Sequence, residues 1–289
     1  MSRKLEAVIL DWAGTTMDYG CYAPAIVFQQ VFAEKKVPVT MEEARKPMGA
    51  HKKIHIRKIT EDAGVSERWI MVYQRVPNEQ DVEEMFNRFV PLQLACLKDY
   101  ADLIPGTLEA VAELRRMGLK IGSTTGYTGE MMKVLLEEAA RRGYAPDASV
   151  CSTGDFAFKD INDPYQFGKM FCQEESFSRP NPQMCDLNAR FLGVKPSNCV
   201  KIGDTLGDIK EGLNAGMWTV GLAKTGNELG LNEQEVQELP LDNLINKIKA
   251  IKEKMYAHGA HYVVDSLGDI TPLISIINSR MAAGERAVK

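Results

Sequence analysis

Hydrophobic and polar positions follow two different periods along this chain, and the change between them predicts its organisation. A continuous apolar run at residues 7–10 fits a strand buried on both faces of a parallel sheet. Apolar residues then recur at helical spacing from about residue 20 to 99. This second stretch predicts helices over 23–34, 48–63, 67–74 and 79–100, and a capping box at 40–43 that opens a further helix.

From Pro105 onward the two patterns alternate. Helices are predicted at 107–117, 130–142, 183–192 and 208–214, and strands at 119–123, 148–151, 200–203, 218–222 and 262–264. Such alternation implies right-handed crossovers and a doubly wound parallel α/β sheet. We therefore expect a Rossmann-like core domain of residues 1–19 and 100–289, with residues 20–99 inserted as a helical cap domain.

The first strand ends in Asp11, at the carboxyl edge of the sheet where open α/β folds bind ligands. A carboxylate there can attack phosphorus while the amides of Gly14, Thr15 and Thr16 bind phosphoryl oxygens. An aspartate that only caps the following turn is an equal alternative at this point.

Three later stretches bring polar residues to strand ends. Thr125 and Gly126 can hold a phosphoryl oxygen, although a helix N-cap would use the same residue types. Asp204 and Asp208 form a carboxylate pair suited to Mg²⁺, although single acids at a helix start are common. Arg179 stands beside the stiff Pro-Asn-Pro stretch and can present a guanidinium to phosphate or to the nucleophile.

Composition narrows the function classes. The 289 residues carry a net charge of -4, so no broad basic field favours nucleic acid. We expect no membrane span and no signal peptide, because no apolar segment is long enough and the N-terminus lacks the pattern. The six cysteines are scattered without a CxxC, which favours reduced thiols and a cytoplasmic location.

Asp11, Thr125, Arg179 and Asp204 occur in the order of the four motifs of the haloacid dehalogenase superfamily, which the chain resembles over its whole core. The resemblance implies an aspartyl-phosphate intermediate and the type I cap of that superfamily. Mg²⁺ would be held by Asp11, Asp204 and the carbonyl of Ala13, with Asp208 as support. Ala13 departs from the phosphatase pattern, which has an acidic residue there to protonate an oxygen leaving group.

The predicted cap contains a lysine that could supply different chemistry. Lys52, His55, Ile56 and Ile59 share one helix face, whereas Lys53 lies on a charged side. A lysine buried on such a face loses its proton more readily and can act as an amine nucleophile. A solvated cation is the ordinary alternative for any helical lysine.

The strings DWAGTTMDYGCYAP, EARKPMG, GSTTGYTGEMM, RPNP and GDTLGDIKEGLNAGMWTVG resemble the phosphonoacetaldehyde hydrolase family, in which alanine at position 13 is usual. The resemblance implies carbon-phosphorus bond hydrolysis through an imine on Lys52, with His55 assisting its proton transfers. It also implies a homodimer formed through the caps. Residues assigned by it to the substrate pocket are Cys21, Met48, Gly49 and Tyr127.

Residues 155–178 depart from that resemblance as an apparent insertion rich in aromatic residues, which predicts an ordered segment packed beside the cap and narrowing the entrance. Two other functions stay open from the sequence. One is a related magnesium-dependent phosphoryl hydrolase in which Lys52 is only a cation. The other is a non-catalytic, phosphate-sensing protein on the same fold.

Overall fold

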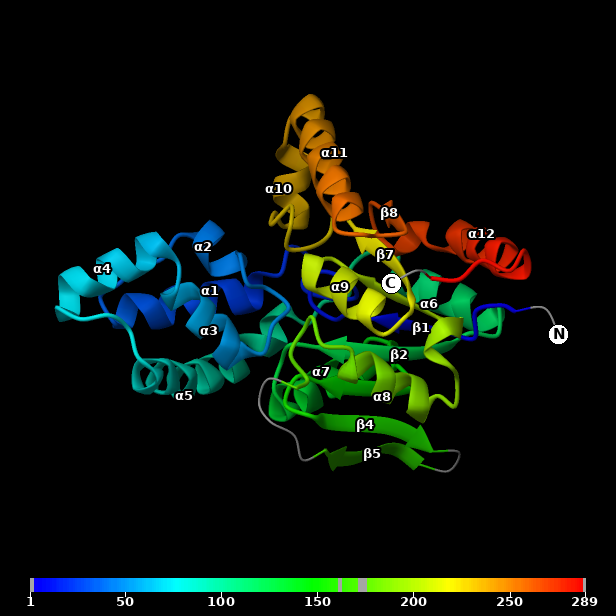
Figure 1. The fold of residues 1–289 in the computed structure, drawn as a ribbon, viewed down its shortest axis with the longest axis horizontal. Coiled ribbons are helices and arrows are strands. Elements are labelled where there is room, and N and C mark those ends of the chain that lie inside the picture. The colour runs from blue at the N-terminus through cyan, green and yellow to red at the C-terminus, as the bar shows by residue number, and fades with distance from the viewer. Residues whose placement is uncertain (1–2, 161–162, 171–175, 288–289) are drawn as a thin grey trace.

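The computed structural model describes residues 3–160, 163–170 and 176–287. Over these residues the chain forms a mixed α/β structure around an eight-stranded sheet of order β5-β4-β3-β2-β1-β6-β7-β8 (Figure 1). The strands are β1 (Ala7–Leu10), β2 (Lys120–Thr125), β3 (Ala148–Cys151), β4 (Asp155–Asp160), β5 (Asp163–Lys169), β6 (Cys199–Gly203), β7 (Trp218–Leu222) and β8 (Tyr262–Val264). Within this order, the neighbours in the stretch β3-β2-β1-β6-β7-β8 all pair in parallel, which confirms the predicted doubly wound sheet.

Strand β1 lies at the centre of the sheet, and its four residues are fully buried. Leu10 pairs with Ser123 of β2 on one side and with Ile202 of β6 on the other. The chain winds away from β1 in opposite directions on these two sides, so the carboxyl end of β1 faces a crevice where parallel α/β sheets bind ligands. Asp11 follows directly at this crevice.

Helices cover both faces of the sheet. Helices α6 (Thr107–Arg116), α7 (Gly129–Arg141) and α12 (Thr271–Ala282) share a hydrophobic cluster with Val8 and Leu10 of β1. Helix α8 (Gln183–Phe191) packs on the opposite face with Ala7 and Ile9. Helix α9 (Leu206–Asn214) packs with α11 (Leu241–Ala257), which follows the short α10 (Glu233–Glu238). The alternating faces of β1 therefore anchor both helical layers.

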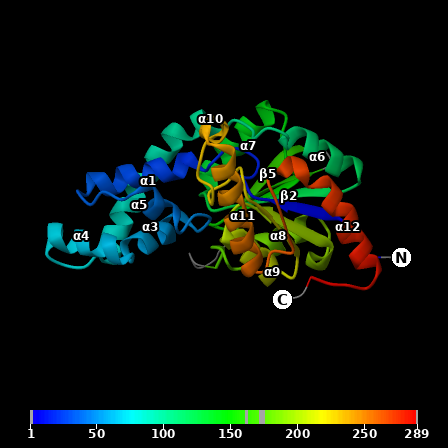
Figure 2. The ribbon, with the colours of Figure 1, turned by 90° about the horizontal axis from the view of Figure 1, so that it is seen from above.

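Residues between β1 and α6 form the predicted helical segment. Its helices are α1 (Tyr22–Glu34), α2 (Met41–Arg45), α3 (Lys52–Thr60), α4 (Ala63–Tyr73) and α5 (Glu79–Cys96), followed by a short 3₁₀ turn (Leu97–Tyr100). Figures 1 and 2 show these helices gathered to one side of the sheet, beyond its crevice. Phe28, Trp69 and Phe89 are fully buried among them and belong to the hydrophobic cluster that continues into the sheet.

The start of α3 differs from the prediction. The sequence pattern extended this helix back to residue 48, but the helix begins at Lys52. Gly49 has a φ of 90°, which favours glycine and cannot continue a right-handed helix, and Pro47 precedes it. Met48 and Gly49 therefore lie in a loop and are free to face the core.

The segment 155–178 also differs from its prediction. Strands β4 and β5 form an antiparallel hairpin that pairs with β3 and extends the edge of the sheet (Figure 1). The prediction that this segment packs beside the cap is therefore wrong for the hairpin. Among its described aromatic residues, Phe158 stacks on Phe191 of α8 and Phe156 lies tilted against it at 4.7 Å between ring centroids, whereas residues 161–162 and 171–175 lie outside the described residues. Ser178, at the end of the segment, does reach the cap through a bond from the amide of His51.

No helix in the described ranges is both long and apolar enough to span a membrane.

Candidate active site

Asp11 is buried at the end of β1, and its carboxylate lies 2.7 Å from Nη2 of Arg179. Burial raises the pKa of Asp11, and the positive charge of Arg179 opposes that shift. The carboxylate therefore points toward a cationic partner in the crevice rather than capping the turn that follows it.

The backbone amides of the loop after Asp11 are not free, contrary to the prediction. The amide of Gly14 donates to the carbonyl of Met17, and the amides of Thr15 and Thr16 both donate to Trp12. These donors close a tight local turn, so the prediction that they are free to bind phosphoryl oxygens is wrong. The turn needs the φ of 80° at Gly14, where an added Cβ would lie 2.4 Å from Asp204.

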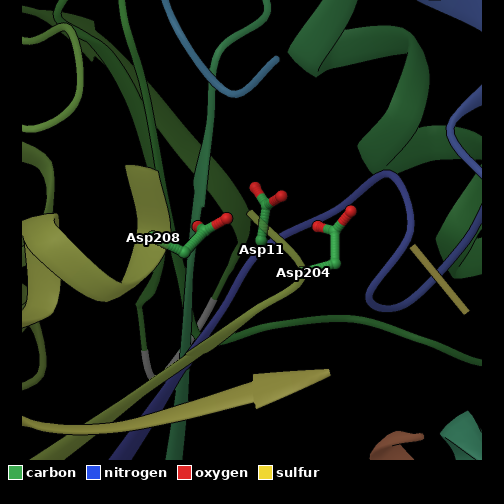
Figure 3. A group of neighbouring side chains, drawn as sticks. All are labelled: Asp11, Asp204 and Asp208. Atoms are coloured by element: carbon green, nitrogen blue, oxygen red, sulfur yellow. The ribbon is translucent and has the colours of Figure 1, made fainter. Parts of the chain in front are cut away.

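Three carboxylates converge below the cap. One oxygen each from Asp11, Asp204 and Asp208 lies within 4.8 Å of the others, and all three residues are buried (Figure 3). Asp204 follows β6, whereas Asp208 belongs to the capping box of α9 and accepts a bond of 2.6 Å from Thr205. The sequence prediction that these acids meet is confirmed.

The three acids titrate differently because their neighbours differ. Burial and the charges of Asp11 and Asp208 raise the pKa of Asp204 well above its usual value. Arg179 and Lys201 lower the pKa of Asp208 despite its burial. Lys201, on β6, lies 2.7 Å from Asp208 and is itself fully buried. Sequence reasoning missed Lys201, although a charged residue within the apolar run of β6 was the signal.

Arg179 is the hub of this network. Its guanidinium contacts Asp11, Asp208 at 3.1 Å and Glu211 at 2.8 Å. It also donates to Thr124 Oγ1 at 2.8 Å. Glu211 was not predicted either; it lies three residues after Asp208, on the same face of α9, and that spacing was available from the sequence.

The buried charges do not balance. Asp11, Asp204, Asp208 and Glu211 carry four negative charges when ionised, and Arg179 and Lys201 supply two positive charges. An excess of buried negative charge is costly unless a cation compensates it. The oxygen-rich donor set and the missing two charges fit a divalent, oxygen-binding cation such as Mg²⁺.

Lys52 lies on the opposite wall, at the first turn of α3. Its side chain is 3% exposed, and Nζ lies 4.6 Å from the centre of the Tyr127 ring and 5.7 Å from that of Phe28. Burial lowers its pKa to about 8, against the attraction of nearby anionic groups. Lys53 points away and pairs with Glu83 at 2.6 Å, so the predicted division between the two lysines is confirmed.

His55 is buried one turn after Lys52. Its ring stacks on Phe28 at 3.8 Å between centroids, and Nε2 lies 2.8 Å from the carbonyl oxygen of Ala44. Burial and the nearby Lys52 lower the pKa of His55 well below its usual value. The imidazole is therefore neutral near neutral pH, with one nitrogen bound to the cap backbone.

One small cavity joins the two walls. Its lining includes Asp11 and Arg179 from the core and Lys52 from the cap. The other lining residues are Ala13, Cys21, Pro24, Met48, Gly49, Thr125, Gly126, Tyr127 and Thr205. The cavity has a volume of about 20 Å³, which is room for roughly one water molecule. A substrate can therefore enter only when the cap and the core separate.

Every pocket residue predicted from the sequence thus lines this cavity, and Pro24 and Thr205 are additions. His55, Asp204 and Asp208 lie behind the lining rather than in it. A cleft of about 280 Å³ adjoins the cavity at Met48 and Arg179. Its other charged or titratable lining residues are Lys46, Lys58, Lys210 and His258.

The family model for haloacid dehalogenase-like hydrolases matches residues 5–216, and a second model of that kind matches residues 176–270. The phosphonoacetaldehyde hydrolase of Syntrophobacter fumaroxidans is 43% identical over 282 residues, covering 97% of this chain and 95% of the relative. The enzyme of the same name from Bacillus cereus is 42% identical, covering 96% of this chain and 98% of the relative.

Solved structures with a similar fold include proteins of this kind. A phosphonoacetaldehyde hydrolase-like protein from Oleispira antarctica superposes with a TM-score of 0.88 at 36% identity, covering 99% of this chain and 96% of that one. A β-phosphoglucomutase from Clostridium difficile superposes with a TM-score of 0.61 at 16% identity, covering 97% of this chain and 100% of that one. The second likeness concerns the fold alone.

Proposed function

This chain belongs to the haloacid dehalogenase-like hydrolases and, within them, to the phosphonoacetaldehyde hydrolase family, and from that membership we propose the reaction and the roles of its residues. The reaction is hydrolysis of the carbon-phosphorus bond of phosphonoacetaldehyde to acetaldehyde and phosphate. The observation that carries the proposal is the cavity itself, which joins the Lys52 amine to the Asp11 carboxylate.

In the proposed first step, Nζ of Lys52 attacks the aldehyde carbon and water leaves, which gives a protonated imine. An amine whose pKa is about 8 is partly neutral near neutral pH, so it can attack without a strong base. His55 assists the proton transfers at this end of the cavity. Its neutral imidazole, one turn along α3, supports that role.

In the second step, an oxygen of Asp11 attacks phosphorus and the carbon-phosphorus bond breaks. The bonding electrons pass into the imine and form an enamine, so no acid at residue 13 has to protonate a leaving oxygen. Ala13 is consistent with this route. The enamine is then protonated and hydrolysed, which releases acetaldehyde and Lys52, and water hydrolyses the aspartyl phosphate to release phosphate.

Asp11, Asp204 and the carbonyl of Ala13 would hold Mg²⁺, with Asp208 supporting the shell from its capping box. When bound, the cation would offset repulsion between the carboxylate and the phosphonate oxygens. Arg179, Thr125 and Gly126 would stabilise the transferring group. Arg179 is already held against Asp11 by Glu211, so its guanidinium is oriented before substrate arrives.

The surroundings support an anionic substrate. Cys21, Met48, Gly49 and Tyr127 would line the pocket around the aldehyde carbon. The adjoining cleft carries only cationic or titratable basic side chains among its charged lining residues, although the whole chain is acidic. A locally positive cleft beside the cavity attracts an anion.

We also propose a homodimer through the caps, a division into a core of residues 1–19 and 100–289 with a cap of 20–99, and a cytoplasmic location. The end of α4 exposes Met71 to 73% and Val72 to 42%, and Val76 beyond it to 61%, which supports a contact there. The described cysteines are all free thiols, which supports a reducing compartment. Light scattering of wild type and Met71→Glu tests the dimer: only the wild type should have twice the chain mass.

The proposed reaction is tested by incubating the purified protein with phosphonoacetaldehyde. Acetaldehyde and phosphate should appear in equal amounts, and a chelator should abolish both until Mg²⁺ is restored. Hydrolysis of simple phosphate esters with no action on phosphonoacetaldehyde would favour the hydrolase without imine chemistry. Release of no product from either substrate would favour a phosphate-sensing protein.

A further inference from the structure

A pair of hydrogen bonds joins the cap to the core away from the reacting groups. Arg45, the last residue of α2, donates from Nη1 to Oδ1 of Asn227 at 3.3 Å. The side-chain nitrogen of Asn227 donates back to the carbonyl of Arg45 at 3.3 Å. Both residues are at most 7% exposed, so water competes little for these bonds.

Asn227 also contacts the acidic cluster. Its backbone amide donates to Oδ2 of Asp204 at 2.7 Å, a distance typical of a bond to a carboxylate. The same loop is fixed to the segment after Asp11, because Thr225 donates to the carbonyl of Gly14 at 2.8 Å and Gly20 donates to the carbonyl of Thr225 at 2.8 Å. Asn227 therefore stands between the cap and a predicted metal ligand.

The partners of Arg45 make these contacts depend on the position of the cap. Its guanidinium donates to the carbonyls of Gly20 and Cys21 as well as to Asn227, and it lies 5.0 Å from the centre of the Tyr22 ring. Gly20 and Cys21 lie at the entry to the cap, and Asn227 lies in the core. When the cap moves to admit substrate, α2 must release at least the Asn227 side chain.

We propose that Arg45 and Asn227 are positioning residues that couple seating of the cap to the orientation of Asp204, and so to Mg²⁺ affinity. This inference rests on the proposed magnesium site. With the cap seated, Asn227 is held through its side chain, and its amide fixes Asp204 toward Asp11. With the cap displaced, the side chain loses both bonds to Arg45 and the loop holds Asp204 less firmly.

The coupling must act in both directions, because a binding equilibrium and a conformational equilibrium that influence each other do so equally. Mg²⁺ should therefore favour the seated cap. Closure of the cap over the substrate would therefore strengthen the binding of Mg²⁺ by Asp11 and Asp204. When the cavity is open, Mg²⁺ would be held less firmly and would offset less of the repulsion between Asp11 and the phosphonate.

The test is calorimetric titration of the full chain with Mg²⁺ alone, without substrate. Asn227→Ala keeps the amide but loses the side-chain bonds, and Arg45→Met loses them from the other side. Each variant should bind Mg²⁺ roughly 10-fold more weakly, the lower end of effects from residues that orient metal ligands. If Arg45→Met folds poorly, Arg45→Lys, which keeps the charge, takes its place and should also weaken binding.

Matched controls separate coupling from general damage. Arg68→Met removes another cap arginine, which pairs with Glu43 of α2 at 2.7 Å, and Asn232→Ala removes another core asparagine, which caps α10. Both should bind Mg²⁺ as the wild type does. The aldehyde should still be trapped on Lys52 by borohydride in Asn227→Ala, because Lys52 lies on the other wall.

The double variant decides whether the two residues act through each other. Arg45→Met with Asn227→Ala should bind Mg²⁺ no more weakly than the weaker single variant. Multiplication of the two single effects, or wild-type affinity in Asn227→Ala, would overturn the coupling. Absence of Mg²⁺ binding in the wild type would instead overturn the magnesium site on which the inference rests.

Discussion

Two buried lysines of this protein have opposite chemistry, and their neighbours explain why. Lys201 is fully buried among Asp208, Glu211 and Arg179, and the two carboxylates raise its pKa despite burial. Lys52 is 3% exposed beside the rings of Tyr127 and Phe28, and burial lowers its pKa to about 8. Burial alone therefore does not make a nucleophile. A lysine becomes one where burial is not matched by adjacent carboxylates.

The largest expected effect separates Lys52 from its sequence neighbour. Lys52→Arg keeps a cation in the cavity but cannot form a neutral amine or an imine, so carbon-phosphorus cleavage should fall below detection. Lys53→Arg keeps an ion pair with Glu83 at the surface and should retain activity within about two-fold, as surface pairs contribute little. Steady-state assays of both variants check this; reversed outcomes would move the nucleophile by one residue.

A carboxylate introduced beside Lys52 should make its surroundings resemble those of Lys201. Ala13 lines the same cavity, so Ala13→Asp would favour the charged amine and would also repel the phosphonate. We expect roughly 100-fold lower turnover of phosphonoacetaldehyde, and a slight gain toward phosphate esters. Parallel assays of both substrates measure the change, with Ala13→Asn as the uncharged control. An Asp variant as active as the Asn variant would contradict the electrostatic explanation.

Lys201 should matter more than Lys52 for stability, whereas Lys52 matters for activity. Lys201→Met leaves Asp208 and Glu211 short of a cation and should lower the free energy of unfolding by about 3–5 kcal/mol. Lys52→Met removes an amine that forms no ion pair within the described part of the chain, and it should change that free energy by about 1 kcal/mol or less. Urea denaturation of both variants at pH 7 provides the comparison; equal losses would mean that the two sites are alike.

The smallest expected effect is a change of activity with pH. Because the reactive form of Lys52 is neutral, activity should rise with pH through about 8 and level off above it. Asp18 accepts bonds from the amides of Tyr22 and Ala23 at the start of α1, and burial raises its pKa to about 7, so it is a second buried group that could titrate in this range. Asp18→Asn keeps a capping oxygen and should leave the rise near pH 8. Loss of the rise in that variant would assign it to Asp18.

The sequence predicted those parts of the fold whose signals are local. The apolar runs of β1, β6 and β7 and the helical spacing of α1 and α3 required no knowledge of distant contacts. The hairpin β4–β5 was missed because its aromatic residues signal burial but not the strand that they pair with. Helices α10 to α12 were not predicted, and α11 leaves the apolar residues Leu241 and Ile245 exposed.

The candidate site divides in the same way. Residues with a motif or a helical face, such as Asp11 and Lys52, were found and do line one cavity. Asn227 was missed, because its contacts depend on which elements approach it in space, whereas Lys201 was missed although its charge within the apolar run of β6 was a signal. The amides of Gly14 to Thr16 were assigned wrongly, because residue type alone does not say whether an amide is already bonded within its own turn.

Reductive trapping tests the central claim most directly. The protein would be incubated with phosphonoacetaldehyde and borohydride at pH 8 and then digested. Mass spectrometry would identify any lysine whose side-chain nitrogen carries the carbon chain of the substrate after reduction of the imine. The adduct should lie on Lys52, require substrate, and be absent from Lys201 and Lys53. Turnover without any adduct, or an adduct spread over surface lysines with none on Lys52, would contradict an imine at this buried amine.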